Sequence, residues 1–334
     1  MKKTVCILLC LCLSLSFLFG CGSEPAPVTA TETTAETTAE TTEPFVELTG
    51  KEALQGKRIM FIGNSYLFCG YTVLQGDCNV VLQDDRENDQ GIFYQLCKAN
   101  GIDVSVTSWA YGSHSMCDFF DGYCAAGREC DGIDHEIHIT NPYFDYVVLQ
   151  FHSERNYTGN VLEYLSNEME FFRKANPNVK FIMHVPHMAY HKSRPVWLND
   201  IDELAEAGVL IADWGQLCHD VAQGNVQVPG ATQEYDLSTF VISWSETDGF
   251  HQNMLCGYLN ALMIYCAITG ESAVGQPWEF TNDSSLHPKM DWERAKALHY
   301  SYNSTTNFIE VFQSEADMHG LQQLADQYLA KFNK

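Results

Sequence analysis

A serine, an aspartate and a histidine stand in this sequence where they could act together on a carbonyl compound. Ser65 closes a Gly-Asn-Ser segment after the apolar run Arg58–Gly63, and Asp248 and His251 are three residues apart before a long apolar segment. A serine hydroxyl is a poor nucleophile until a base removes its proton, and an oriented histidine is the usual base. The residue types therefore indicate nucleophilic catalysis, with Ser65 as nucleophile, His251 as general base and Asp248 as the acid that orients it.

The segments that must position these residues alternate between strand-like and helix-like patterns. Five apolar runs have strand length: Lys57–Gly63, Ile102–Trp109, Tyr143–Gln150, Val179–Val185 and Val209–Ala212. Helical spacing is found in Ile92–Asn100, Val161–Ala175, Leu198–Ala207, Leu255–Thr269, Trp292–Phe312 and about Leu321–Phe332. This alternation predicts an α/β fold, a three-layer α/β/α sandwich with a central, mostly parallel five-stranded sheet.

Residues that could take part in a reaction follow four of the five predicted strands. In open parallel sheets, sites lie beyond the carboxyl ends of the strands. Ser65 follows the first run, Gly112 to His114 the second, Gln150 to Ser153 the third, and His184 to His187 the fourth. We therefore expect these side chains to meet at one edge of the sheet.

These short motifs resemble the GDSL/SGNH hydrolase superfamily over about residues 57–270. Gly-Asn-Ser matches the first family block, with Asn where the family name has Asp, and the resemblance implies that Ser65 is the nucleophile and one oxyanion donor. Gly112 matches the lone glycine of the second block, which implies a second donor. Asp248 and His251 match the Asp-x-x-His block, and the fold implied is the flavodoxin-like fold of the family. The sequence contains no Gly-x-Ser-x-Gly elbow, which argues against the lipase subgroup of α/β-hydrolases.

The third block departs from the family pattern. The family usually carries Gly-x-Asn-Asp after this strand, and the Asn side chain completes the oxyanion hole. Here the strand ends in Gln150, whose amide offers the same chemistry, with Ser153 and Asn156 as alternatives. Loss of one oxyanion donor costs roughly 3–4 kcal/mol of transition-state stabilisation, so one residue must fill the role. Gln150 is the residue we favour.

These features predict a serine esterase that acts on small O-acyl groups, most plausibly acetyl esters on carbohydrate, without a cofactor. Substrate contacts are expected from Asn64, His152, His187 and Trp244. Two alternatives stay open: a lipase or thioesterase with the same chemistry, and a non-catalytic carbohydrate-binding lipoprotein. Aromatic residues near the strand ends are usually core, yet they could form platforms for sugar rings; they are Trp109, Tyr111, Trp197, Trp214 and Trp244.

A histidine cluster offers a third alternative, a metal-dependent hydrolase. His184, His187 and His191 are close enough in sequence to bind zinc, with Asp213 or His152 as further ligands. Pro186 forbids the single helical face that His-x-x-x-His sites use. We therefore predict no metal site and assign these histidines to the polar rim of the cleft.

The N-terminus predicts export and lipidation. Residues 1–21 have a basic start, an apolar stretch and the ending Leu-Phe-Gly-Cys, which resembles a bacterial lipobox with Cys21 as the lipidated residue. Residues 22–46 are rich in Thr, Glu and Ala and predict a disordered linker. Residues 47–334 then form the catalytic domain, which we expect to be extracytoplasmic and bound to the bacterial membrane only through Cys21.

The charge and the cysteines restrict the partners further. The chain has 43 acidic and 19 basic residues, a net charge of −24, which argues against nucleic acid as a partner. Of its 13 cysteines, Cys256 and Cys266 are predicted to be buried helix residues. Disulfides are plausible between Cys69 and Cys78 or within a group of three cysteines, but sequence alone does not give the pairing; the group is Cys117, Cys124 and Cys130.

Overall fold

The structure is a computed structural model, and all residues it describes belong to the second of two units, Glu47–Lys334. The described ranges are 48–68, 70–73, 82–83, 91–110, 139, 141–150, 161–186, 201–240, 252–279 and 314–333.

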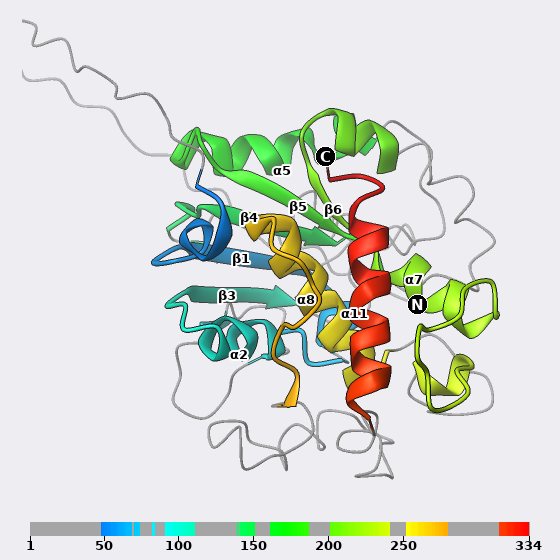
Figure 1. Cartoon of the computed structure of the whole chain (residues 1–334). Helices are drawn as coiled ribbons and strands as arrows, with labels where there is room; N and C mark the ends of the chain where they lie inside the picture. Colours follow the sequence, from blue (N-terminus) through cyan, green and yellow to red (C-terminus); the bar gives the residue numbers. More distant parts are fainter. Residues whose placement is uncertain are drawn as a thin grey trace, which may run out of the picture. The chain divides into compact units, whose positions relative to one another are not determined.

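A six-stranded sheet in the order β2-β3-β1-β4-β5-β6 forms the centre of the described part (Figure 1). The strands are β1 (Arg58–Gly63), β2 (Leu82–Gln83), β3 (Ser105–Ala110), β4 (Tyr146–Gln150), β5 (Lys180–His184) and β6 (Leu210–Ala212). All neighbours pair in parallel except β2, which pairs antiparallel with β3. The prediction of a central sheet with five parallel strands is confirmed, and the two-residue β2 is an addition that the sequence pattern did not indicate.

Helices cover both faces of this sheet. They are α1 (Ser65–Phe68), α2 (Ile92–Ala99), α5 (Val161–Ala175), α7 (Trp214–Ala222), α8 (Met254–Thr269) and α11 (Glu315–Leu329), with 3-10 turns η1 (Gly50–Ala53) and η2 (Leu237–Thr239) and helical residues 201–206. The predicted helix Trp292–Phe312 lies outside the described residues. The predictions for α2, α5, α8 and α11 are confirmed, whereas α7 was not predicted.

Side chains alternate between the two faces of the sheet along each strand, so the hydrophobic core has two parts, one on each face. In β1, Ile59 and Phe61 belong to the same hydrophobic core as residues of α2, α7, α8 and α11, whereas Met60 and Ile62 belong to a second core with residues of α5 and residues 201–204. Successive strand side chains point to opposite faces, so a strand buried on both sides is apolar throughout. The predicted three-layer α/β/α arrangement is thus confirmed.

Helix α8 is buried around its whole circumference. Fifteen of its sixteen residues are buried, and the helix contacts α2, α7, α11 and the strands β5 and β6. It ends at Gly270, whose positive φ of 70° closes the last turn, and its last residue, Thr269, is also the last residue of the predicted helix. Cys256 and Cys266 are buried in this helix, which confirms their predicted positions.

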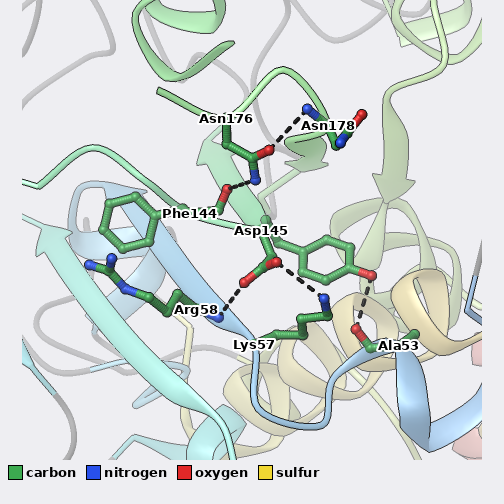
Figure 2. Close-up of polar contacts among 8 residues, drawn as sticks. Ala53, Lys57, Arg58, Phe144, Asp145, Asn176 and Asn178 are labelled. Carbon is green, nitrogen blue, oxygen red and sulfur yellow. Dashed lines mark hydrogen bonds and ion pairs between the residues drawn. The ribbon is translucent and has the colours of Figure 1, made fainter. Parts of the chain in front are cut away.

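The amino ends of β1 and β4 are joined by a cluster of polar contacts (Figure 2). Asp145 forms an ion pair of 3.2 Å with Lys57 and accepts a hydrogen bond of 2.9 Å from the backbone N–H of Arg58. Asn176, which follows α5, donates to the carbonyl of Phe144 at 2.8 Å. This cluster fixes the register of the two strands at their amino ends, opposite the carboxyl ends that Ser65 and Gln150 follow or close.

The outer side of β6 is covered by a side chain instead of another strand. The Asn333 amide accepts a hydrogen bond of 2.9 Å from the N–H of Ile211 and donates one of 2.7 Å to its carbonyl. Both main-chain groups of this edge residue are therefore satisfied.

Candidate functional site

The strand order contains a topological switch point, where the connections from one strand run to opposite sides of the sheet. After β1 the chain forms β3 on one side of that strand and β4 on the other. In open parallel sheets of this kind, ligands bind outside the carboxyl ends of the strands where the order reverses. Here that point lies between β1 and β4, and Ser65 and Gln150 are the residues at their ends.

A hydrogen bond joins these two strand ends. The backbone N–H of Asn64 donates to Gln150 Oε1 at 2.9 Å. Because an N–H group can face only an acceptor, this contact fixes the Gln150 amide with its oxygen toward Asn64 and its NH₂ group in another direction. No described residue accepts a hydrogen bond from this NH₂ group.

Gly63 leaves the space that this contact needs. An added Cβ atom at Gly63 would lie 2.5 Å from Gln150 Oε1 and 2.9 Å from Gln150 Cβ. The glycine of the Gly-Asn-Ser segment is therefore required for the approach of the Gln150 side chain, and not for a special backbone angle.

Asn64 shapes the turn that presents Ser65. Its side chain is buried, and Oδ1 accepts a hydrogen bond of 3.1 Å from the N–H of Tyr66. The N–H of Leu67 bonds to the Asn64 carbonyl at 2.8 Å, so the chain turns into α1 directly after the strand. Ser65 opens this turn and is partly exposed. A substrate contact of Asn64 stays a prediction, because the described contacts of this side chain are with the turn.

Gln252, which sequence reasoning did not single out, contacts the Ser65 segment directly. Its side chain is fully buried, and Nε2 donates to the carbonyl of Ser65 at 3.4 Å and to the carbonyl of Tyr66. Gln252 is the residue that follows His251 in the sequence. Gln252 is therefore the first described residue after the predicted Asp-x-x-His motif, and its side chain contacts the segment that carries Ser65.

Two glycines allow the segment after α1 and the start of α8 to touch along their backbones. An added Cβ atom at Gly257 would lie 1.6 Å from the carbonyl oxygen of Gly70, and one at Gly70 would lie 2.7 Å from the carbonyl oxygen of Asn253. Next to this contact, the Thr72 hydroxyl donates to the Gly257 carbonyl at 3.1 Å, and Asn260 Nδ2 donates to Thr72 Oγ1 at 3.1 Å. The segment after α1 is thus held tightly against the start of α8.

The N-cap of α8 is Asn253. Its side chain accepts a hydrogen bond from the N–H of Cys256 at 3.3 Å, and its Nδ2 donates to the Thr239 carbonyl at 2.7 Å. An alternative interpretation of the Asp-x-x-His motif is that Asp248 caps this helix. That interpretation is wrong, because Asn253 occupies the cap position.

His184 does not lie on a polar rim. It is fully buried, and its Nδ1 accepts a hydrogen bond of 3.1 Å from the indole N–H of Trp214. The prediction of a rim position is therefore wrong for His184, since Trp214 follows β6 and covers the end of β5. Of the side chains considered for zinc, the Asp213 carboxylate accepts from the N–H of Gln216 at the start of α7, and His184 Nε2 has no hydrogen-bond partner among the described residues. The zinc alternative is not tested further, because His152, His187 and His191 lie outside the described residues.

Two of the five aromatic residues near the strand ends are core residues. Trp109 and Trp214 are completely buried, so neither can serve as a platform for a sugar ring. The other three, Tyr111, Trp197 and Trp244, lie outside the described residues.

Several predicted site residues also lie outside the described part of the chain; they are Cys21, Gly112, His152, His187, Asp248 and His251.

Within the described ranges, no group of three or more His, Cys, Asp or Glu residues could hold a metal ion. No helix among the described residues is long and apolar enough to span a bilayer. The structure thus brings Ser65, Asn64 and Gln150 together and adds Gln252 to them.

Burial of His184 has a consequence for stability at acid pH. Removal from water lowers the pKa of His184 to about 3, and the nearby Asn260 amide opposes this shift only in part. The unfolded chain binds a proton near pH 6.5 whereas the folded chain does not, so stability falls as the pH decreases from about 6.5 toward about 3. We expect His184→Gln to remove this contribution, at roughly 1 kcal/mol per pH unit below about pH 6.

Urea unfolding of the wild type and His184→Gln at several pH values between 7 and about 4.5 measures this effect. The variant's stability relative to the wild type should rise steadily as the pH falls. His319→Gln, at an exposed histidine of α11, is the control and should not change the slope. Parallel curves for the wild type and His184→Gln would contradict the assignment.

Comparison with known proteins gives distant similarities only. No family model and no curated protein matches the chain. The chain is similar to the structure of a candidate SGNH hydrolase from Slackia heliotrinireducens, with 14% identity, 64% of this chain and 99% of that chain covered, and a TM-score of 0.37. It is similar to a family two carbohydrate esterase from Clostridium thermocellum in complex with cellohexaose, with 13% identity, 65% of each chain covered and a TM-score of 0.37.

A third similar structure is a DUF4886 family protein from Bacteroides uniformis, with 14% identity, 75% of this chain and 97% of that chain covered, and a TM-score of 0.37. With TM-scores below 0.5, these similarities carry no argument about activity or substrate.

Proposed function

We propose that this protein is an extracytoplasmic, lipid-anchored serine esterase that hydrolyses small O-acyl esters, with O-acetyl groups on carbohydrate as the expected substrate. The contact of Gln252 with the Ser65 carbonyl carries this proposal, because Gln252 is joined covalently to the predicted base, His251. The position of Ser65 at the switch point of the sheet adds independent support.

The proposed reaction proceeds through an acyl-enzyme. His251 removes the proton from the Ser65 hydroxyl as Ser65 Oγ attacks the ester carbonyl carbon, and Asp248 orients the imidazole and stabilises its charged form. The tetrahedral intermediate then expels the alcohol, which takes the proton from His251. Water attacks the acyl-enzyme by the same route and releases the carboxylic acid and the free Ser65 hydroxyl. No metal or cofactor takes part in these steps.

Three donors are proposed to stabilise the oxyanion: the backbone N–H groups of Ser65 and Gly112, and the Gln150 side chain. The fixed orientation of the Gln150 amide supports its role, because its NH₂ group is not used by any described residue. An oriented donor that needs no reorganisation during the reaction is the arrangement that stabilises an oxyanion best.

Replacement of Gln150 by glutamate tests this role with a minimal change in shape. Glu keeps an oxygen for the N–H of Asn64 but loses both amide donors, so we expect kcat to fall by roughly 10²–10³-fold with little change in KM. Gln150→Met, which loses both the acceptor and the donors, should be at least as impaired. The measurement is steady-state hydrolysis of a nitrophenyl ester, with thermal melting to confirm folding. Full activity of Gln150→Glu would transfer the role to Ser153 or Asn156.

The proposed location agrees with a carbohydrate ester as substrate. After removal of the leader that precedes it, lipidated Cys21 would hold the catalytic domain at the outer side of the membrane through the linker 22–46, where acylated polysaccharides would be accessible. Asn64, His152, His187 and Trp244 are proposed to contact the substrate. The net charge of −24 disfavours nucleic acid and anionic lipid.

The proposal is tested with purified full-length protein on a panel of acetylated glycans, with a generic nitrophenyl acetate as reference. A fluorophosphonate, which reacts with activated serines, identifies the nucleophile by peptide mass spectrometry. We expect acetate release that chelators do not inhibit, and a single label on Ser65.

Each alternative predicts a different result. Glycan binding without acetate release or labelling would indicate a non-catalytic binding protein. A preference for long acyl chains or thioesters would indicate a lipase or thioesterase. Loss of activity on chelation would indicate a metal-dependent hydrolase.

A further inference from the structure

The buried amide of Gln252 has two ends in different environments. Its Nε2 donates to the carbonyls of Ser65 and Tyr66, and since carbonyls accept only donors, these contacts fix the amide orientation. Its Oε1 is buried and has no hydrogen-bond partner among the residues that the structure describes. A buried acceptor without a donor costs about 1–3 kcal/mol, so stability alone does not explain a glutamine here.

Among the contacts of the described residues, this amide is the nearest to Ser65 between two segments that are 186 residues apart in sequence. The other contacts between them, at Gly70, Thr72 and Asn260, hold the body of α8. Gln252 precedes the α8 cap and contacts the carbonyl of the proposed nucleophile itself. A shift of this side chain would therefore move Ser65 relative to the residue that precedes Gln252, which is His251.

We propose that Gln252 is a positioning residue, which sets the place of Ser65 relative to His251 through its hydrogen bonds to the carbonyls of Ser65 and Tyr66. This inference rests on the proposed serine esterase function. Proton transfer from a hydroxyl to an imidazole requires heavy atoms within hydrogen-bond reach. A misplacement of about 1 Å can cost a factor of about 10² in rate, so a contact that does not touch the substrate can control the reaction.

A second buried glutamine provides a matched control. Gln322 of α11 is also buried, and its Nε2 donates to the Tyr258 hydroxyl and to the Gln276 carbonyl at 2.8 Å. Its Oε1 accepts from the N–H of Gly275 at 2.9 Å, so all of its contacts are structural. Methionine has a similar length and no hydrogen-bond donor, which makes it the same test at both positions.

The experiment compares the wild type with Gln252→Met and Gln322→Met. Gln252→Met should lower kcat by about 100-fold, leave KM within a few-fold and slow fluorophosphonate labelling of Ser65, with little change in melting temperature. Gln322→Met should lower the melting temperature and leave kcat and labelling unchanged. Wild-type kcat in a folded Gln252→Met would overturn the inference.

A second variant gives a signature that a purely structural role would not produce. In Gln252→Glu, a buried carboxyl group has a raised pKa, and only its protonated form has an O–H group, which can donate to one of the two carbonyls. The ratio of kcat/KM between Gln252→Glu and the wild type should therefore rise as the pH falls from about 8 to about 5. A constant ratio would count against a role of the hydrogen bond.

Different experimental results would overturn this inference and the proposed function. If the wild type hydrolyses no ester and Ser65 is not labelled, both are overturned. If the wild type is active and Ser65→Ala is inactive while Gln252→Met matches the wild type, only the positioning role is overturned.

Discussion

Ser65→Ala is expected to lower kcat for ester hydrolysis by about 10⁴-fold or more, with KM changed only a few-fold. The alanine variant keeps the oxyanion donors and the substrate contacts but has no oxygen to form the acyl-enzyme. Such a loss corresponds to at least about 5 kcal/mol of transition-state stabilisation. The folded structure should persist, because Ser65 is partly exposed and its contact with Gln252 uses the main-chain carbonyl.

The strongest form of this test is a double variant. If Ser65 and His251 act as a unit, His251→Ala should be about as impaired as Ser65→Ala, and the double variant should lose little more. Ser105→Ala and His319→Ala serve as controls, since Ser105 opens β3 at the opposite edge of the sheet and His319 is exposed on α11. More than a tenth of the wild-type kcat in Ser65→Ala would refute the mechanism.

Gly257→Ala is expected to be among the most destabilising substitutions in α8. Its Cβ atom would lie 1.6 Å from the Gly70 carbonyl oxygen, and backbone atoms cannot move aside as a flexible side chain can. Overpacking of a core typically costs about 1–3 kcal/mol, and a clash with backbone should reach or exceed the upper end of this range. Because the same contact places α8 next to the Ser65 segment, activity should fall even at temperatures where the variant is folded.

The measurement combines urea unfolding with esterase activity at low temperature. Gly270→Ala is the control at the other end of the same helix, where a positive φ of 70° strains the substitution but no atom lies within 4 Å. It should cost about 1–2 kcal/mol and leave kcat unchanged. A Gly257→Ala protein as stable and active as the wild type would show that the two segments do not touch as described.

The fold was predictable from the sequence because its main strands are buried on both faces and are therefore apolar throughout. β1 and β4 are examples, and the points where their apolar runs end indicated that Ser65 and Gln150 lie at one edge of the sheet. The short β2 was not predictable, because a two-residue strand has no pattern and depends on its partner β3.

Helix α7 carried a signal that the sequence interpretation missed. Asp213 is a suitable N-cap residue, and apolar residues follow it at helical spacing; they are Trp214, Leu217, Cys218 and Val221.

The role of His184 and the contact of Gln252 could not be predicted, for a common reason. A polar residue at a strand end is usually near solvent, but Trp214, thirty residues later, covers His184. The Gln252 amide contacts a segment 186 residues away, and its own sequence neighbours give no sign of this. Both depend on tertiary packing, which local patterns do not encode.

The Asn333 side chain prevents another polypeptide from pairing with the outer side of β6. An unpaired strand edge is a template on which another polypeptide can add a strand, and proteins cover such edges to avoid aggregation. By satisfying both main-chain groups of Ile211, one carboxamide replaces the missing strand. Asn333→Ala would expose this template, and self-association of concentrated protein would then originate at β6, which is separated from β4 by β5 in the order of the strands.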